Sequence, residues 1–364
     1  MHILHVYKDY APVLGGIENH IRLLAQAQAA QGHRVTVLVT NPGGQPAEEE
    51  DGGARVIRAR RLATVASTPL SLDLPRRLAR LRPDVTHLHF PYPVGELSQL
   101  WAGRNRPYTI TYHSDVVRQK VILRFYGLFL RRVLRGAGRI IVSSAPYGQS
   151  SPWLRPHSHK CVVIPFGLDV ARFGGKIRPL IPPAAVPTIL FIGRHRYYKG
   201  VDDLIRAMAQ APARLLIGGE GPMRPAWERL AGELKLGGRV QFLGDISDAD
   251  LPAFYASGDI FALPANSRAE AFGIVLQEAM AAGLPCVTTE LGTGTSWLVR
   301  DGQSGFVVPP RQPDQLAAAL NRLLADPDLR RQMGRAGRER ARQEFTISHM
   351  TASIENVYRQ LIDD

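Results

Sequence analysis

The stretch from Thr188 to Gly219 reads TILFIGRHRYYKGVDDLIRAMAQAPARLLIGG. A short apolar run, TILFIG, is followed by DDLIRAMAQA, whose apolar residues recur at helical spacing, and then by a second apolar run, ARLLIGG. Two short strands joined through a helix form a βαβ unit, in which the strands lie parallel in one sheet. This stretch therefore predicts a parallel sheet covered by helices.

The same alternation extends along the chain, and its clearest interruption lies between residues 169 and 187. There the sequence DVARFGGKIRPLIPPAAVP is rich in Gly and Pro and has no regular periodicity, which is typical of a linker. We therefore expect an α/β protein with two Rossmann-like, doubly wound domains, over residues 1–170 and 171–345, and a C-terminal helix over 346–364 that packs back toward the first domain. The expected strands are ILHVY, VTVLVT, VTHLHF, YTITYH, RIIVSS and VVIPFG, then TILFIG, ARLLIGG, VQFLG, DIFALPA, CVTT and GFVVPP.

The composition is that of a basic globular protein. The 364 residues carry a formal net charge of +13, which favours contact with nucleic acid, acidic lipid or phosphorylated ligands without choosing among them. Cys161 and Cys286 lie in apolar runs, which indicates buried structural thiols in a reducing compartment. No apolar run resembles a signal peptide or reaches the length of a membrane span, so we expect a cytoplasmic protein.

Ligands of doubly wound sheets bind beyond the carboxyl ends of the strands, so the residues after each strand are the candidates. Gly15 and Gly16 let the backbone approach a ligand at a helix N-terminus, or else form a tight turn. His113 and Asp115 could hold sugar hydroxyls or assist proton transfer, and the alternative for Asp115 is a capped turn. Tyr10, after the first strand, is a further candidate contact to a sugar or an acceptor.

Two patterns could suggest a metal. His87 and His89 share one face of a strand, and with His113 they could form a three-histidine zinc site. No ligand-spaced set accompanies them, and strand-end histidines are common in apolar clefts, so we favour histidines without a metal. Asp248 and Asp250 spell a D-x-D, but ISDADLPAFYASG has the pattern of a Ser-capped helix start. We therefore expect neither a metal nor a cofactor.

The second half places charged and glycine-rich residues after its strands. The planar guanidinium of Arg194 and the compact ammonium group of Lys199 are suited to hold a diphosphate between them. The alternative is that both are solvated surface charges. The next strand ends in IGGEGP, where Gly219 and Glu220 belong to a turn that lets the backbone approach a ligand. These residues are candidates for an anion site.

Glu270 and Glu278 stand eight residues apart in the stretch AEAFGIVLQEAMAA. Eight residues of helix rise about 12 Å, which is too far for a pair of glycosidase carboxylates, separated by about 5 to 9.5 Å. If a helix begins near Gly273, its free N–H groups and dipole form an anion site between the two glutamates. The pair would then bracket a phosphate.

These motifs occur in the order found in the retaining, nucleotide-sugar-dependent glycosyltransferases of family 4, which the chain resembles over nearly its whole length. The resemblance implies a GT-B fold, with an N-terminal acceptor-binding domain and a C-terminal domain that binds the nucleotide sugar. The strings TYHSDVVRQK, RAEAFGIVLQEAM and LGTGTSWLV are similar in particular to the branch of bacterial mannosyl and rhamnosyl transferases that act in surface polysaccharide synthesis.

The resemblance also implies roles for the candidate residues. Glu270 would lie beside the donor sugar, and Glu278 would bond the ribose. Arg194 and Lys199 would neutralise the charge that grows on the leaving diphosphate. His113 matches a position at which relatives hold the donor sugar or aid catalysis. The remaining donor-binding positions that we assign are Gly15, Gly16, Gly219, Glu220, Ala271, Phe272, Gly273 and Ile274.

The implied substrates are a GDP-mannose donor and a saccharide or lipid-linked acceptor. A UDP-sugar is the alternative donor, because base contacts in this fold are largely to backbone. The chain departs from the family pattern at Ala271, where many relatives carry Gly. Two other classes compete. A nicotinamide oxidoreductase requires a Gly-rich fingerprint followed by an acidic residue, and neither half shows both. A basic, non-enzymatic polyanion binder requires aromatic residues interleaved on a basic face, which we do not find, so we expect no nucleic-acid partner.

Residues 118–139, RQKVILRFYGLFLRRVLRGAGR, carry seven basic residues and no acidic one. Apolar residues are interleaved at near-helical spacing with Arg124, Arg131, Arg132 and Arg135, the pattern of a helix on an anionic bilayer. The alternative is a core-packed helix whose basic face meets only water. Many relatives act on lipid-linked acceptors, so the resemblance favours peripheral contact with the cytoplasmic face of a membrane.

Overall fold

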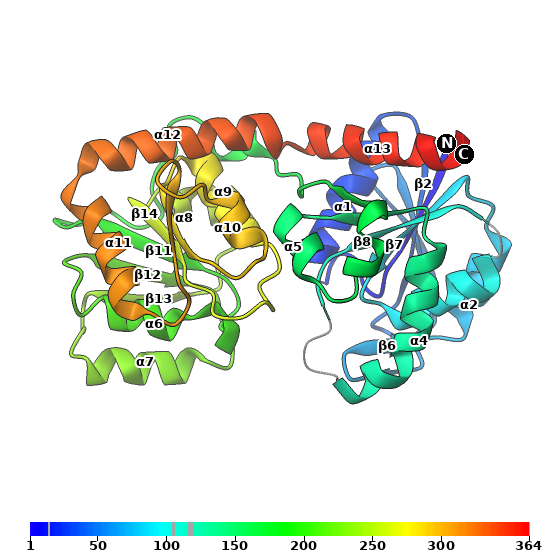
Figure 1. Ribbon diagram of the computed structural model, residues 1–364, viewed down its shortest axis with the longest axis horizontal. Helices are drawn as coiled ribbons and strands as arrows, with labels where there is room; N and C mark the ends of the chain where they lie inside the picture. The colour runs from blue at the N-terminus through cyan, green and yellow to red at the C-terminus, as the bar shows by residue number, and fades with distance from the viewer. Residues whose placement is uncertain (14, 104–105, 116–119, 364) are drawn as a thin grey trace. The chain divides into compact units, whose positions relative to one another are not determined.

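The computed structural model describes residues 1–13, 15–103, 106–115 and 120–363 (Figure 1). The chain divides into an N-terminal unit, Met1–Gly167 with Ile347–Asp364, and a C-terminal unit, Leu168–Thr346. Each unit is built on its own sheet covered by helices, as the βαβ pattern predicts. The expectation of two Rossmann-like parallel sheets is confirmed.

Within the described residues, the N-terminal unit holds an eight-stranded sheet that is parallel except at the edge strand β3. The strand order reverses at β1, with β2 on one side and β7 on the other. Ligands bind where the order reverses, so the ligand edge is expected at the carboxyl ends of β1 and β7. In sheet order the strands are β10 (Cys161–Val163), β9 (Arg139–Val142), β8 (Tyr108–Tyr112), β7 (Val85–Phe90), β1 (His2–Val6), β2 (Arg34–Thr40), β4 (Ala54–Ala59) and β3 (Ala47–Asp51).

The strand register gathers histidines on one face of this sheet. His5 of β1 pairs in register with His87 of β7, and alternate residues of a strand face the same side, so His89 joins them. The helices α1 (Gly16–Ala30) and α13 (Ile347–Asp363), which lie side by side in Figure 1, cover this face. Tyr358 of α13 is fully buried there. The C-terminal helix therefore completes the core of the N-terminal unit.

The other elements of this unit surround the sheet. Strands β3 and β4 were not predicted. The sequence AEEED of β3 is too polar to look like a strand, and β3 pairs only at the edge. Cys161 is half-buried, so the expectation of two buried thiols is right only for Cys286. The remaining elements are a hairpin of β5 (Ala63–Val65) and β6 (Thr68–Leu70), helices α2 (Asp73–Arg80), α3 (Pro93–Ser98), α4 (Lys120–Gly136) and α5 (Ala145–Ser150), the π-helix η1 (Gln99–Gly103) and the 3-10 helix η2 (Arg155–Lys160).

The C-terminal unit holds a six-stranded parallel sheet among its described residues. Numbered within the unit, its strand order is 3-2-1-4-5-6, the order of dinucleotide-binding sheets. The crossing point lies between β11 and β14, so the loops that follow these two strands flank the expected ligand site. In sheet order the strands are β13 (Val240–Gly244), β12 (Arg214–Gly218), β11 (Thr188–Ile192), β14 (Ile260–Leu263), β15 (Cys286–Thr289) and β16 (Gly305–Val308).

Close helix packing fixes the position of α9 (Ile274–Ala282) in this unit. Helix α12 (Pro327–Glu344) crosses its C-terminal end, where a Cβ on Gly334 would lie 2.0 Å from the carbonyl oxygen of Gly283. Only glycine permits this approach. The other helices are η3 (Val170–Phe173), η4 (Tyr197–Lys199), α6 (Val201–Ala207), α7 (Arg224–Glu233), η5 (Asp248–Asp250), α8 (Leu251–Tyr255), α10 (Gly294–Leu298) and α11 (Pro313–Ala325).

Candidate functional site

Two loops meet at the crossing point of the C-terminal sheet. The loop after β11 carries Lys199, and the loop after β14 carries Glu270. The Nζ atom of Lys199 lies 2.6 Å from Oε2 of Glu270, and both residues are buried. The amide of Asn266 donates to the carbonyl of Tyr198 at 2.9 Å, which ties the two loops together. The candidate diphosphate-binding lysine is thus paired with the candidate sugar-side glutamate.

This ion pair sets the charge state of Lys199. Burial, the largest single effect, lowers the pKa of its ammonium group, but the attraction of the Glu270 carboxylate, the neighbouring Tyr198 and the hydrogen bond to Glu270 together outweigh it, and the pKa lies above its usual value. Lys199 is therefore charged at neutral pH. A fixed cation in buried surroundings stabilises nearby negative charge more strongly than one in water.

Glycines allow the neighbouring loops to pack together. Gly219 has a φ of 100°, and a Cβ there would lie 2.3 Å from the carbonyl oxygen of Gly193. The amide of His195 donates to the carbonyl of Glu220 at 2.8 Å. The GGEGP turn therefore packs directly on the loop that carries Arg194, whose side chain is exposed.

The N-terminus of α9 lies next to Glu270 in the chain. Gly273 precedes the helix with a left-handed φ of 92°, so the predicted helix start is confirmed. The carbonyl of Ala271 accepts from the amide of Gly294 at 2.8 Å, and a Cβ on Gly294 would lie 2.6 Å from Cα of Phe272. The LGTGTSWLV stretch therefore packs on the residues before α9. Because the first N–H groups of a helix lack intrahelical acceptors, the start of α9 at Ile274 favours an anion.

Glu278 lies within α9 and is half-buried. The hydroxyl of Tyr255 donates to its Oε2 at 2.7 Å. Burial raises the pKa of Glu278 to about 7, and the hydrogen bond from Tyr255 opposes this rise. The carboxyl group therefore changes its charge near neutral pH. Tyr255 was not predicted as a site residue, because it lies in a segment read only as a helix.

In the N-terminal unit, His113 follows β8 at the carboxyl edge of the sheet and is 4% exposed. Its Nε2 lies 3.1 Å from Nδ1 of His89, and its own Nδ1 has no hydrogen-bond partner among the described residues. Burial, with a smaller contribution from His20, lowers the pKa of His113 well below its usual value. His113 is therefore a neutral imidazole at pH 7.

Asp115 and Tyr10 are already engaged in hydrogen bonds within the protein. Asp115 accepts hydrogen bonds from the hydroxyls of Tyr112 at 2.9 Å and Ser151 at 2.7 Å, which favours its interpretation as a turn-stabilising residue. Tyr10 is fully buried, and its hydroxyl donates to Asp51 at 3.0 Å. Neither side chain is positioned as an open contact to a ligand.

Three further candidates lie in or next to the first turn of a helix. Gly15 and Gly16 are exposed at the start of α1. Glu220 precedes α7 and forms an ion pair with Arg224 at the start of that helix. The structure therefore gives the side chain of Glu220 a partner at the start of α7, while its backbone lies next to the Arg194 loop.

Buried histidines form two groups whose ligand atoms lie within 4.8 Å of one another. One is His5, His87 and His89, and the other is His20, His89 and His113. Neither is the set of His87, His89 and His113 considered from the sequence, because β1 and α1 contribute members that sequence spacing does not reveal. Both ring nitrogens of His89 already contact His5 and His113 at 3.1 Å. The expected absence of a metal stays a prediction.

The D-x-D of Asp248 and Asp250 forms the 3-10 helix η5. The hydroxyl of Ser247 accepts from the amide of Asp250 at 3.2 Å, and Arg172 pairs with Asp248 at 3.1 Å. The predicted Ser-capped helix start is confirmed.

Comparison with known proteins decides the family. Residues 14–172 match the family described as Glycosyltransferase Family 4, and residues 178–340 match Glycosyl transferases group 1. The O-antigen chain mannosyltransferase C of Escherichia coli is 34% identical over 100% of this chain and 99% of its own length. The chain is a family 4 glycosyltransferase.

Two more similarities agree with this assignment. The D-rhamnosyltransferase WbpZ of Pseudomonas aeruginosa is 35% identical to the glycosyltransferase, over 95% of this chain and 92% of its own. The solved structure of sucrose-phosphate synthase from Thermosynechococcus elongatus superposes with a TM-score of 0.82 at 27% identity, over 100% and 99% of the two chains. The enzyme thus belongs with the bacterial mannosyl and rhamnosyl transferases, and its two sheets are those of the GT-B fold.

The basic segment of the glycosyltransferase is partly described. Residues 118 and 119 and the side chains of residues 120–125, Arg124 among them, lie outside the described part. Further along α4, Leu130 and Val133 are buried, whereas Leu128 is 72% exposed and Phe129 is 51% exposed. Arg131, Arg132 and Arg135 are exposed as well. The exposed side of α4 therefore combines apolar and cationic side chains.

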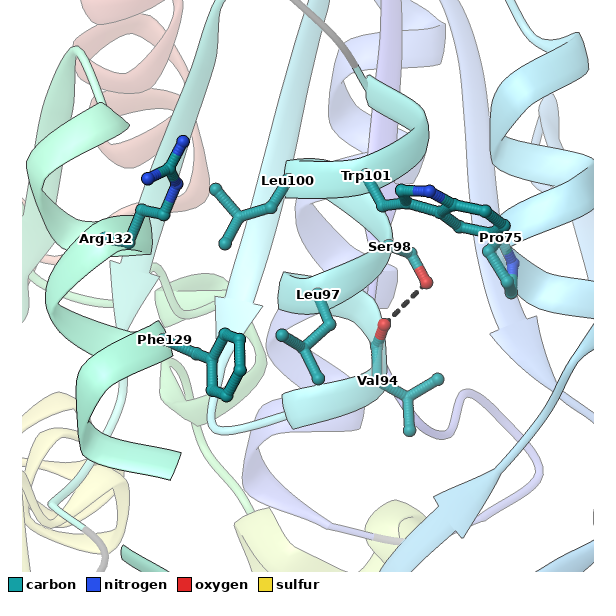
Figure 2. A pocket seen from close by; sticks show the side chains of 8 residues that line it. All are labelled: Pro75, Val94, Leu97, Ser98, Leu100, Trp101, Phe129 and Arg132. Carbon is teal, nitrogen blue, oxygen red and sulfur yellow. Dashed lines mark hydrogen bonds between the residues drawn. The ribbon is translucent and has the colours of Figure 1, made fainter. Parts of the chain in front are cut away.

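Two adjoining pockets open beside this side of α4. The first, of about 490 Å³, is apolar, and Trp101 on its wall is 78% exposed (Figure 2). The second, of about 700 Å³, shares Leu100 and Arg132 with the first, and its described lining residues include four arginines and no acidic residue. None of the described helices is long and apolar enough to cross a bilayer. The first pocket is lined by Pro75, Val94, Leu97, Ser98, Leu100, Trp101, Phe129 and Arg132, and the arginines of the second are Arg106, Arg132, Arg135 and Arg139.

Proposed function

We propose that this glycosyltransferase moves mannose from GDP-mannose, with retention of configuration and without a metal, to a saccharide or lipid-linked acceptor in surface polysaccharide or glycolipid synthesis. The observation that carries the proposal is the Lys199–Glu270 pair beside the start of α9. It combines a fixed cation, a carboxylate and a helix N-terminus at the crossing point of one sheet.

The cations would act on the leaving group. Negative charge grows on the diphosphate as the bond to the sugar breaks, and Lys199, Arg194 and the amides before and at the start of α9 would stabilise it. Because Lys199 is held by Glu270, its charge is in place before the donor binds and needs little reorganisation during the reaction.

The carboxylates would hold the two ends of the donor. Glu270 would accept a hydrogen bond from a hydroxyl of the sugar, and Glu278 would accept one from the ribose, with Tyr255 holding its carboxyl group in position. His113 would accept a hydrogen bond from a hydroxyl of the saccharide through Nδ1, which has no partner among the described residues. No side chain is required as a nucleophile.

The names of the relatives support mannose or rhamnose as the transferred sugar, since two of them are a mannosyltransferase and a rhamnosyltransferase. A UDP-sugar is the alternative donor, and a GT-B structure from Anabaena contains UDP, although at 20% identity it speaks for the fold alone. Thermal shift with GDP, UDP, NAD and single-stranded DNA separates the classes. Stabilisation by GDP alone, followed by turnover of GDP-mannose to an α-linked product, is the expected result. Stabilisation by NAD or DNA alone would overturn the proposal.

The enzyme would also bind the cytoplasmic face of an anionic membrane. The proposal is supported by the mixed apolar and cationic side of α4, and by the apolar pocket whose wall carries Trp101. Among its relatives, the phosphatidyl-myo-inositol mannosyltransferase of Mycobacterium tuberculosis, 31% identical over 95% of this chain, is named for a phospholipid substrate. Contact with the bilayer would bring the enzyme to a lipid-linked acceptor.

A further inference from the structure

A continuous chain of buried hydrogen bonds runs through the N-terminal unit and ends at His113. From His113 the contacts lead to His89 at 3.1 Å, from His89 to His5 at 3.1 Å, and from His5 to Gln28 of α1 at 2.8 Å. On its other side, Gln28 contacts the Tyr358 hydroxyl at 3.4 Å. The contacts then continue to His87 at 2.6 Å and to Thr111 at 2.6 Å. All seven side chains are buried.

The histidines of this chain are neutral at pH 7. Burial lowers the pKa of His5 to about 4, and burial with repulsion between the rings holds the pKa of His87 and His89 well below the usual value. A neutral imidazole carries one N–H donor and one bare acceptor nitrogen. If one nitrogen of a ring accepts a hydrogen bond from one neighbour, the other nitrogen must donate to the next. The donor-to-acceptor direction of the hydrogen bonds is therefore the same along the whole chain of rings.

The amide of Gln28 decides that direction. Its Oε1, which can only accept, faces Nε2 of His5, so His5 carries its proton on Nε2 and accepts through Nδ1. His89 must then donate from Nε2 and accept through Nδ1, so His113 donates from Nε2. The Nδ1 of His113 is left as a bare lone pair, and it has no partner among the described residues.

We propose that Gln28 is a positioning residue that fixes His113 as the Nε2–H tautomer and thereby makes its Nδ1 the hydrogen-bond acceptor for a hydroxyl of the saccharide ligand. The ligand part of this inference rests on the proposed function, whereas the tautomer part rests only on the hydrogen bonds. Rotation of the Gln28 amide by half a turn reverses every bond of the chain and converts Nδ1 of His113 into a donor. One amide thus selects between two opposite hydrogen-bonding roles of a distant ring.

His20 places two further buried polar atoms beside His113. Its ring lies 5.3 Å from that of His113 between centroids, it is 4% exposed, and neither of its nitrogens has a partner among the described residues. Buried polar atoms are rarely left unpaired. A ligand with hydroxyl groups would donate to the lone pair on Nδ1 of His113. It would also accept a hydrogen bond from one nitrogen of His20 and donate to the other.

The tautomers can be read directly in the full-length protein labelled with ¹⁵N-histidine, without substrate, by long-range ¹H–¹⁵N correlation. His5, His87, His89 and His113 are all expected as Nε2–H tautomers, each assigned through a single His→Asn variant. A proton on Nδ1 of His113 in the wild type overturns the proposal. This measurement decides the matter even if the variants of Gln28 fail to fold.

Two substitutions at Gln28 and a matched control test the cause. In Gln28→Leu the Nε2–H of His5 loses its acceptor, so a mixed or reversed tautomer is expected at His113. Gln28→Glu keeps an acceptor facing His5 and should keep the wild-type tautomer. Gln26→Leu makes the same change on α1, where Gln26 instead contacts Asp51, and should leave His113 unchanged. An unchanged His113 tautomer in Gln28→Leu refutes the role of Gln28.

The functional part is measured separately. Addition of GDP-mannose should shift the ¹⁵N resonance of His113 Nδ1, and Gln28→Leu should lower kcat/KM about tenfold, the effect of about one hydrogen bond, with Gln26→Leu unaffected. If the tautomers are as expected but GDP-mannose causes no shift, the donor assignment fails and the tautomer inference stands. If turnover is confirmed but His113 is protonated on Nδ1, the inference fails and the proposed function stands.

Discussion

Lys199 and Glu270 form a buried ion pair, with 2.6 Å between Nζ and Oε2, whereas Arg194 lies exposed on the same loop as Lys199. The two cations proposed to act on the diphosphate therefore differ in what they contribute to folding. Lys199 compensates a buried carboxylate whereas the Arg194 side chain is exposed, so activity and stability should separate between their variants.

We expect Lys199→Met to lower the free energy of unfolding by about 3 kcal/mol, because the Glu270 carboxylate is left buried without its partner. Turnover should fall about 10²-fold or more. Arg194→Met should lower turnover similarly while stability stays within about 0.5 kcal/mol. Urea unfolding and a transfer assay measure both. The double variant Lys199→Met with Glu270→Gln should regain stability but not activity, and equal stability of all variants would contradict this account.

The raised pKa of Glu278 predicts a pH-dependent stability. The carboxyl group titrates near 4.5 when unfolded and near 7 when folded, so the folded protein holds the proton more tightly between these values. This contribution is complete below pH 4.5 and is lost as the pH rises through 7. Glu278→Gln cannot titrate and should lack this loss. The free energies of unfolding of the wild type and of Glu278→Gln, measured at pH 5 and pH 8, test this prediction. The prediction is wrong if the two proteins differ by the same amount at both pH values.

Gly219→Ala should damage the nucleotide site. Its φ of 100° disfavours a side chain, and a Cβ would lie 2.3 Å from the carbonyl of Gly193, so we expect a loss of more than about 1 kcal/mol together with weaker nucleotide binding. Gly232, inside helix α7, is the matched control because a Cβ there meets nothing within 4 Å. Gly232→Ala should instead raise stability by about 0.5–1 kcal/mol. Thermal unfolding with and without GDP compares the two, and similar behaviour would exclude a special role for Gly219.

The sequence predicts what local patterns encode. Apolar runs locate the central strands of both sheets, and Gly273 before an apolar helix locates the start of α9. The polar β3 escapes prediction because its only pairing is at a sheet edge.

Contacts between distant segments are harder to derive. The candidate residues Lys199 and Glu270 are recognisable, but their ion pair depends on two loops that meet only in the folded sheet. Tyr255 and Gln28 carry no motif at all, and their importance comes from the partners that folding gives them, Glu278 and the histidine chain. A functional side chain that acts through another side chain is therefore visible only in three dimensions.

Activity should persist after exhaustive treatment with EDTA, since the proposed leaving-group stabilisation relies on Lys199, Arg194 and α9 rather than on a divalent ion. The buried histidine groups provide the specific alternative. Metal analysis of the purified enzyme, with turnover before and after chelation, distinguishes the two. Loss of activity that Mn²⁺ or Zn²⁺ restores would show that the metal-free mechanism is wrong.

The membrane prediction concerns the exposed arginines of α4. We expect the enzyme to sediment with vesicles that contain anionic phospholipid, and not with neutral vesicles, because each basic residue near an anionic surface contributes roughly 1 kcal/mol. Binding should weaken at high salt, which shortens the screening length. Trp101→Ser should weaken binding without changing the charge, because it removes an exposed apolar side chain from the wall of the pocket.

A triple variant separates a specific surface from net charge. Substitution of Arg131, Arg132 and Arg135 by Ser should abolish sedimentation with anionic vesicles. The control removes the same number of charges from exposed arginines of α12 in the C-terminal unit, and it should bind as the wild type does. Equal losses in both variants would indicate attraction by net charge alone, and no sedimentation of the wild type would point to an acceptor that is not in the membrane. The control positions are Arg331, Arg335 and Arg342.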